Sequence, residues 1–234
     1  MSTRTIGRMV GALILVAFLA YGGGSALVDS ASGASAMLSE VASNQLRISA
    51  GVLLILLNSA VVTAIGVLAF PVLSKHDEIA AHAYLVTRVF EAVILAVGAL
   101  GLLLLVPLSQ EYAEAGGGEN SFLPALARLA QDANQNAYTF AMIVLGLGSL
   151  MFCRVLLRAR LVPRLLAIWG MVGYAIVGAG MMLEVLGYSI GLALWIPGGL
   201  FELALGVLLI ARGFPERGGA VARSDSDRQV EAAA

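Results

Sequence analysis

The stretch that decides the fold is YLVTRVFEAVILAVGALGL, residues 84–102. Six residues in it recur at alternating spacings of four and three, namely Tyr84, Arg88, Glu91, Leu95, Gly98 and Leu102. This spacing places them on one face of a helix. An unpaired charge near the centre of a bilayer costs roughly 3 kcal/mol or more. We therefore predict that the face carrying Arg88 and Glu91 points toward protein, water or a partner, and that the other segments are arranged around it.

The composition predicts an integral membrane protein of the all-α class. The chain has 234 residues, of which 59% are hydrophobic and 12% charged, and its mean hydropathy is +0.91. These values exclude a disordered chain and an ordinary soluble domain. The net charge of -1 provides no basic field for a nucleic acid. The protein should therefore contact a lipid bilayer and no nucleic acid.

No metal and no cofactor is predicted. Cys153 is the single cysteine, which excludes an intrachain disulfide and a cysteine cluster. The two histidines, His76 and His82, are six residues apart and so do not share a helix face as a metal-binding pair would. The single lysine, Lys75, lies in a turn outside the apolar segments.

Apolar stretches predict a bundle of six transmembrane helices within residues 1–212, followed by a disordered cytoplasmic tail over residues 213–234. For the first stretch, a cleaved signal peptide is the less favoured alternative, because the apolar run continues beyond the usual length of a signal core. The expected spans cover residues 6–28, 49–73, 81–108, 137–157, 165–186 and 190–210.

The basic residues predict the orientation. Outside the spans, Lys and Arg gather at the N-terminus, in the second and fourth loops and in the tail, whereas Arg47 and Arg128 lie on the other side. The positive-inside rule then places both termini in the cytoplasm. The densest basic cluster is expected to determine topology and, secondarily, to contact anionic lipids; it consists of Arg154, Arg158, Arg160 and Arg164.

A second acidic residue, Glu202, lies in the sixth span. Its expected depth, from a rise of about 1.5 Å per residue, matches that of Arg88 and Glu91, so the three groups are within reach of one another. Gly198 and Gly206 flank it by one turn on either side, which suits close helix contact. We thus predict a polar site between the third and sixth spans.

Two further residues are candidates for this site. Tyr84 shares the face of Arg88 and Glu91. Asn58, inside the second span, is interpreted first as a hydrogen-bonding group between helices and second as a ligand contact. Pro197, just before Glu202, is expected to interrupt the sixth helix. The dipeptide Phe-Glu occurs in the third and sixth spans, as Phe90-Glu91 and Phe201-Glu202. This weak similarity would fit an inverted repeat.

The charged group has two interpretations that stay open at this point. In the first, Arg88 pairs with Glu91 at i, i+3, or with Glu202 across a helix contact, and locks the bundle. In the second, one Arg against two Glu leaves an excess negative charge, and the site holds a proton, a cation or a cationic ligand.

Several segments of this chain resemble those of a known family, the bacterial multi-pass membrane proteins catalogued as domain of unknown function 4386. The resemblance implies six helices with the first one retained, and it implies no established activity. Glu91 departs from the family pattern, in which a neutral polar residue is common, so the resemblance implies Arg88 and Glu202 as the shared pair. The matching segments are Val28-Asp29-Ser30, Leu46-Arg47-Ile48, residues 87–92, residues 158–164 and residues 197–213.

Three classes of function follow. The favoured one is a small-molecule, ion or proton site inside the bundle, used for transport or sensing. The alternative is a non-catalytic accessory or lipid-interacting protein, with a homo-oligomer or another membrane protein as partner. An intramembrane enzyme is the least favoured, because the spans lack a HExxH motif and a Gly-x-Ser-x-Gly motif, and the only histidine within a span is His82, at the very start of the third span.

Overall fold

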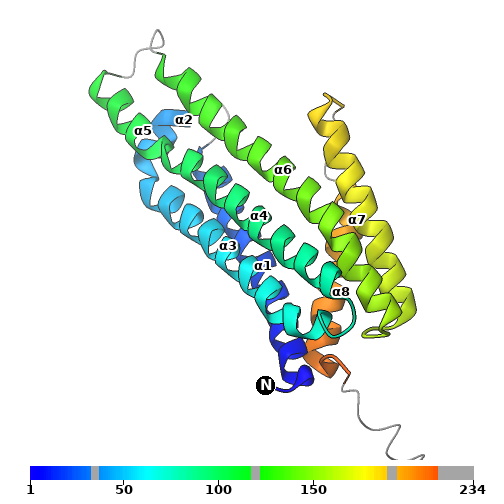
Figure 1. Ribbon diagram of the computed structural model, residues 1–234. Helices are drawn as coiled ribbons and strands as arrows, with labels where there is room; N and C mark the ends of the chain where they lie inside the picture. Colours follow the sequence, from blue (N-terminus) through cyan, green and yellow to red (C-terminus); the bar gives the residue numbers. More distant parts are fainter. Residues whose placement is uncertain (33–36, 117–121, 189–193, 216–234) are drawn as a thin grey trace, which may run out of the picture.

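The computed structural model describes residues 1–32, 37–116, 122–188 and 194–215, and these ranges contain helices and no strands (Figure 1). The all-α prediction is confirmed. The helices are α1 (Thr3–Ser32), α2 (Met37–Ser43), α3 (Gln45–Leu73), α4 (Glu78–Leu103), α5 (Leu105–Glu114), α6 (Leu123–Arg158), α7 (Arg164–Val185) and α8 (Ile196–Arg212).

Five helical segments in the described ranges are long and apolar enough to cross a membrane: α1, α3, α4 continued by α5, α6 and α7. The protein is thus a multi-pass membrane protein in contact with lipid. The sixth predicted span, residues 190–210, corresponds to α8, which is described from Ile196 and has 17 residues. The expected start of that span at residue 190 lies outside the described residues.

The long helices form a closed ring in which each one packs against its neighbours in the sequence. The order around the ring is α1, α3, α4, α6, α7 and α8, and α8 closes it by packing on α1. In this order α4 and α8 stand opposite each other. The sequence predicts a close approach between these two helices. In the ring, neither helix is a main packing partner of the other. The charged residues of α4 and α8 consequently face each other across the interior.

Paired glycines allow close approach at four of the six contacts in the ring. A Cβ atom on Gly24 would lie 2.7 Å from the backbone oxygen of Gly51, so α1 and α3 meet with their backbones nearly touching. A Cβ atom on Gly11 would lie 2.6 Å from the backbone oxygen of Gly206, which joins α1 to α8. Small residues are typical of helix contacts in membranes, where packing replaces the hydrophobic effect as the attraction. The other two contacts, α6 with α7 and α7 with α8, use Gly146 with Gly178 and Gly173 with Gly198.

Prolines and a capping aspartate set several helix boundaries. The Asp77 carboxylate accepts a hydrogen bond from the Ala80 N–H at 3.0 Å and begins α4. Pro107 lies near the end of the third expected span, residues 81–108, and the helix continues past it to Glu114. Lacking an N–H, it cannot donate to the carbonyl of Leu103, and the helix breaks one residue further on, at Leu104, before continuing as α5. Pro197 lies in the first turn of α8, where its missing N–H is tolerated.

Two further boundaries differ from expectation. Helix α6 is a continuous helix of 36 residues that begins at Leu123 and contains the fourth expected span, residues 137–157. Its length of about 54 Å exceeds the bilayer core of about 30 Å. At the other end of the chain, Phe214 is buried against the first turns of α1 near Gly7, so the bundle extends past residue 212. Residues 216–234, most of the predicted disordered tail, lie outside the described residues.

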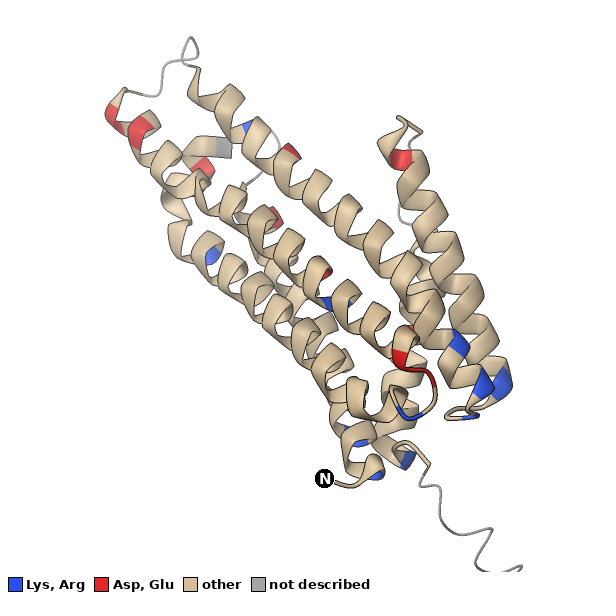
Figure 2. Cartoon of the chain, in the orientation of Figure 1, with Lys and Arg blue, Asp and Glu red and all other residues tan. Residues whose placement is uncertain are grey.

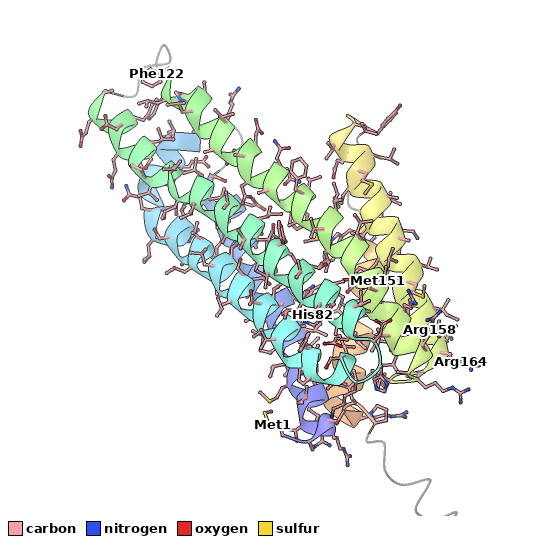
Figure 3. The ribbon with its side chains drawn as sticks, in the orientation of Figure 1. Met1, His82, Phe122, Met151, Arg158 and Arg164 are labelled. Carbon is pink, nitrogen blue, oxygen red and sulfur yellow. The ribbon has the colours of Figure 1, made fainter. Side chains whose placement is uncertain are left out.

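The charges are distributed unequally between the two ends of the bundle. Figure 2 shows most Lys and Arg at the end where the chain begins, and acidic residues toward the other end. In Figure 3, Met1, Arg158 and Arg164 lie at the first end and Phe122 at the opposite end. The first helical residues of α1 and the last of α8 therefore share one end of the molecule.

Candidate functional site

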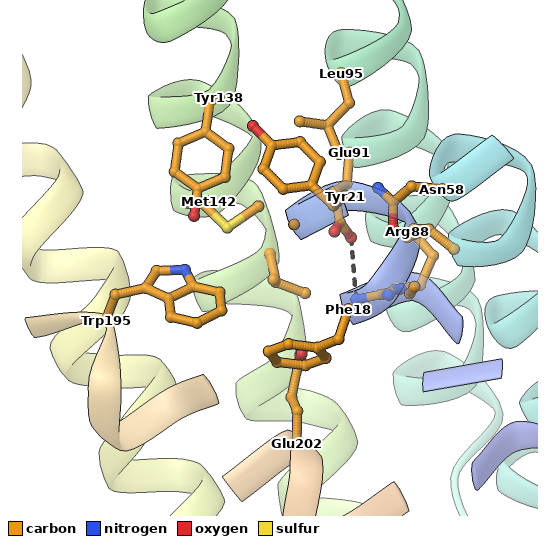
Figure 4. A pocket seen from close by; sticks show the side chains of 14 residues that line it. Phe18, Tyr21, Asn58, Arg88, Glu91, Leu95, Tyr138, Met142, Trp195 and Glu202 are labelled. Carbon is orange, nitrogen blue, oxygen red and sulfur yellow. Dashed lines mark ion pairs between the residues drawn. The ribbon is translucent and has the colours of Figure 1, made fainter. Parts of the chain in front are cut away.

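A cavity of about 300 Å³ lies inside the ring, and residues of α1, α3, α4, α6 and α8, with Trp195 just before α8, line it (Figure 4). Four of the five predicted site residues are on its wall: Asn58, Arg88, Glu91 and Glu202. The wall is otherwise mostly apolar. The cavity volume is at the lower end of the range of volumes found for small-molecule sites.

Arg88 and Glu91 form an ion pair on the cavity wall. Arg88 Nη1 lies 3.0 Å from Glu91 Oε2, and the residues are only 5% and 3% exposed. Although the two atoms are close, the Arg88 N–H groups are not directed at Glu91 Oε2. Neither Glu91 Oε2 nor Arg88 Nε therefore has a hydrogen-bond partner within the described residues. Gly66 permits this placement, because a Cβ atom there would lie 2.9 Å from Arg88 Cβ. The pair is therefore buried with unused hydrogen-bonding capacity.

Glu202 stands on the opposite wall and has a different partner. Its Oε1 accepts a hydrogen bond of 2.5 Å from the Tyr174 hydroxyl, which connects α8 to α7. Among the described residues, no Lys, Arg or His lies within ion-pair distance of Glu202. Of the two partners that the sequence allowed for Arg88, the structure places it with Glu91. Glu202 is half-buried and remains without a countercharge in contact.

Tyr84 does not line the main cavity but lines a smaller void next to it. Its ring stacks on Phe152 with centroids 4.4 Å apart, and the Arg88 guanidinium carbon is 5.9 Å from the Tyr84 centroid, at the outer limit of a cation–π contact. A void of only about 20 Å³ next to the main cavity brings Tyr84 and Arg88 together with Tyr174 and Glu202. Tyr84 is thus a neighbour of the charged group that supports Arg88 from one side.

Asn58 reaches the cavity from α3. It is buried, and within the described residues its side chain makes no hydrogen bond to another helix. The helix-to-helix hydrogen bond that was its first interpretation is therefore absent from the described residues, and the amide faces the cavity instead.

Sequence reasoning missed the aromatic part of the wall. Phe18 and Trp195 make an edge contact with centroids 5.7 Å apart, and Tyr21 and Tyr138 stack with centroids 5.2 Å apart. It also missed Tyr174, the hydrogen-bond donor to Glu202. The presence of Tyr and Trp within apolar stretches could have indicated these positions, because a buried Tyr O–H or Trp N–H usually has a hydrogen-bond partner.

The two Phe-Glu pairs of the third and sixth spans differ in how their Phe side chains are packed. Phe90 is 58% exposed on the outside of the bundle, whereas Phe201 is fully buried. Equivalent positions of a structural repeat would share an environment. The two Phe-Glu pairs are thus not equivalent in this respect.

The predicted basic cluster lies at the end of the bundle where the chain begins. Arg154 and Arg158 line a surface pocket of about 230 Å³ together with Lys75, His76 and Asp77. Arg160 and Arg164 are exposed and outside this pocket. Arg160 has a φ of 52° and ends α6 through hydrogen bonds from Leu161 N to Leu156 O and from Arg160 N to Leu157 O.

Within the described residues, no three or more His, Cys, Asp or Glu side chains are grouped so that they could hold a metal ion. Cys153 is fully buried in the helix packing.

The fold and the cavity together define a multi-pass helical membrane protein with a partly polar cavity lined by its helices. The chain belongs to the family described as a domain of unknown function (DUF4386), whose model matches residues 9–213. This match confirms the family resemblance. No curated protein and no solved structure matches the chain.

Proposed function

We propose that the protein binds a small molecule, ion or proton in the cavity between α4 and α8, and uses this binding for transport or sensing. The observation that carries the proposal is a cavity of about 300 Å³ whose otherwise apolar wall bears Arg88, Glu91 and Glu202. Charged side chains at membrane depth are costly, and they recur where a protein handles a polar ligand or a proton. A purely structural lock would need the charges but not the space beside them.

Gly22 offers a way to fill the cavity without disturbing the bundle. It is on the cavity wall, and a Cβ atom on it would meet no atom within 4 Å. Gly22→Phe should therefore obstruct the cavity while the fold remains. Its neighbour Gly23 is equally exposed but does not line the cavity, and the nearest atom to a Cβ there is 3.9 Å away. Gly23→Phe is thus a matched control on the same helix.

The test is a thermal-shift screen of the protein in lipid nanodiscs against a library of small molecules. A compound present at 100 times its Kd stabilises the folded state by about 2.7 kcal/mol. We expect compounds that raise the melting temperature of the wild type and of Gly23→Phe, but not of Gly22→Phe. Flux of such a compound into proteoliposomes would then separate transport from sensing. Equal stabilisation of all three proteins, or of none, would contradict a ligand site in this cavity.

A second candidate function, contact with anionic lipids, is supported by the surface pocket of Lys75, Arg154 and Arg158. Basic pockets at the cytoplasmic side of membrane helices are suited to lipid phosphates. The wild type should melt at a higher temperature in nanodiscs with phosphatidylglycerol than in those with phosphatidylcholine alone. The double variant Arg154→Gln/Arg158→Gln should lose this difference, and Arg164→Gln, which lies outside the pocket, should keep it. An unchanged difference in the double variant would exclude the pocket as the lipid site.

We also propose that α8 is the sixth transmembrane helix and that the basic end faces the cytoplasm of a bacterium, with both termini on that side. The grouping of Lys and Arg at one end supports this orientation (Figure 2).

A further inference from the structure

The charged groups on the cavity wall do not cancel. Arg88 is within 3.0 Å of Glu91 and is neutralised by it. Glu202 receives only the hydrogen bond of the neutral Tyr174 hydroxyl. Counting the three charged residues on the wall, one positive and two negative charges leave a net charge of -1 in the cavity. A low-dielectric site with this net charge repels anions and attracts a single positive charge.

The shape and chemistry of the wall favour an organic cation over a bare ion. The volume of about 300 Å³ is far larger than a metal ion needs, and the wall is mainly apolar. Aromatic side chains surround the space on three helices: Phe18 and Tyr21 from α1, Tyr138 from α6 and Trp195 at the start of α8 (Figure 4). Aromatic faces attract ammonium groups through their quadrupoles and pack against apolar bodies.

A buried carboxylate oxygen that accepts no hydrogen bond indicates the form of the cation. Glu91 is 3% exposed and lines the cavity, and its Oε2, although it lies 3.0 Å from Arg88 Nη1 in the ion pair, accepts no hydrogen bond within the described residues. An N–H of a protonated amine would satisfy this oxygen, whereas a quaternary ammonium has no N–H to give.

We propose that the ligand of this cavity is a protonated amine with an apolar, aromatic body, whose ammonium group is countered by Glu202 and Glu91 and whose body packs among the aromatic side chains. The proposal rests on the proposed function, because it assigns a substrate class to the same cavity. It commits to the charge of the ligand, which the proposed function leaves open.

Three probes with the same phenylpropyl body separate charge from shape: 3-phenylpropylamine, a cation at neutral pH; butylbenzene, its uncharged isostere; and 4-phenylbutyrate, an anion. The reporter is the fluorescence of Trp195, which lines the cavity. The chain has two tryptophans, and the other, Trp169, lies on α7 away from the cavity wall. The full-length variant Trp169→Phe in lipid nanodiscs therefore reports on the cavity alone.

We expect 3-phenylpropylamine to change the Trp195 emission with saturation, and with a Kd at least tenfold lower than those of butylbenzene and 4-phenylbutyrate. Glu202→Gln in the same background should raise the Kd for the amine at least tenfold and leave that for butylbenzene unchanged. Glu184→Gln, the same substitution outside the cavity, should change neither. The comparison of amine with isostere uses no cavity variant, so it stands even where Glu202→Gln fails to fold.

Two results would overturn the proposal, and they have different meanings. Equal binding of amine and butylbenzene, with no effect of Glu202→Gln, would show a ligand cavity that does not select cations. The proposed function would then survive and the substrate class would fall. If none of the three probes changes the Trp195 emission or the melting temperature, and the Gly22→Phe screen finds no cavity ligand, both proposals fail together.

Discussion

The Tyr174 hydroxyl donates a hydrogen bond of 2.5 Å to Glu202 Oε1 and so joins α7 to α8 beside the central cavity. The two residues are 28 positions apart, and the glycine contact between Gly173 and Gly198 brings their helices together. This bond holds the carboxylate of Glu202 at the cavity wall and satisfies one of its oxygens.

Tyr174→Phe removes this donor and leaves the ring in place. We expect a loss of about 1–3 kcal/mol in the free energy of unfolding, since a hydrogen bond to a charged acceptor is involved. Denaturant titration in mild detergent would measure it. Tyr188→Phe, at an exposed tyrosine after the same helix, is the control and should have no effect. A stability of Tyr174→Phe equal to that of the control would mean that the bond does not stabilise the contact between α7 and α8.

The Arg88–Glu91 pair should behave as a buried ion pair. Arg88→Leu alone leaves the Glu91 carboxylate without its cation, and we expect a loss of about 3–5 kcal/mol. The double variant Arg88→Leu/Glu91→Leu removes both charges and should be more stable than the single one. A double-mutant cycle, completed with Glu91→Leu, gives the coupling energy. Losses that simply add would show that the two residues do not interact.

Close contact between α1 and α8 makes Gly11 intolerant of a side chain. A Cβ atom there would lie 2.6 Å from the Gly206 oxygen and 2.9 Å from the Ile210 nitrogen, both backbone atoms that cannot move independently of α8. We expect Gly11→Val to lower the free energy of unfolding by about 1–3 kcal/mol or more through overpacking. Gly23→Val, with its nearest atom at 3.9 Å, should be neutral. Equal melting temperatures of the two variants in nanodiscs would contradict the α1–α8 contact.

The proposed orientation can be read from single cysteines in intact cells. The native Cys153 is fully buried and should not react with a maleimide in the folded protein, so it need not be removed. Arg128→Cys and Arg160→Cys place an accessible thiol on α6 and just after its end. A membrane-impermeant maleimide should label the first and not the second until the cells are opened. The reverse pattern would invert the assigned topology.

Local features of the sequence predicted a large part of this structure. Alternating spacings of four and three put Tyr84, Arg88, Glu91, Leu95, Gly98 and Leu102 on one face, and all six are buried in α4. Five of the predicted apolar stretches form helical segments long enough to cross a membrane. These features depend on residues within a few turns of one another, so a single sequence contains them.

The composition of the cavity wall was not predictable in the same way. In a membrane helix both the lipid-facing and the protein-facing sides are apolar, so periodicity cannot distinguish them. Phe90 and Phe201 illustrate this: the same Phe-Glu pair occurs twice, yet one ring points outward and the other inward. Likewise, nothing near Tyr21 or Tyr138 in the sequence indicates that their rings stack.

By itself, the sequence determined the class of the protein, its family and the presence of Arg88, Glu91 and Glu202 within apolar stretches, because hydropathy, charge and motifs are properties of the chain. Only the tertiary structure decided that Arg88 pairs with Glu91, that the Tyr174 hydroxyl donates a hydrogen bond to Glu202, and that both groups line one cavity. The physical reason is the closure of the ring. Once glycine contacts bring α1 against α8, α4 and α8 face each other across the interior, and that order results from packing between distant segments.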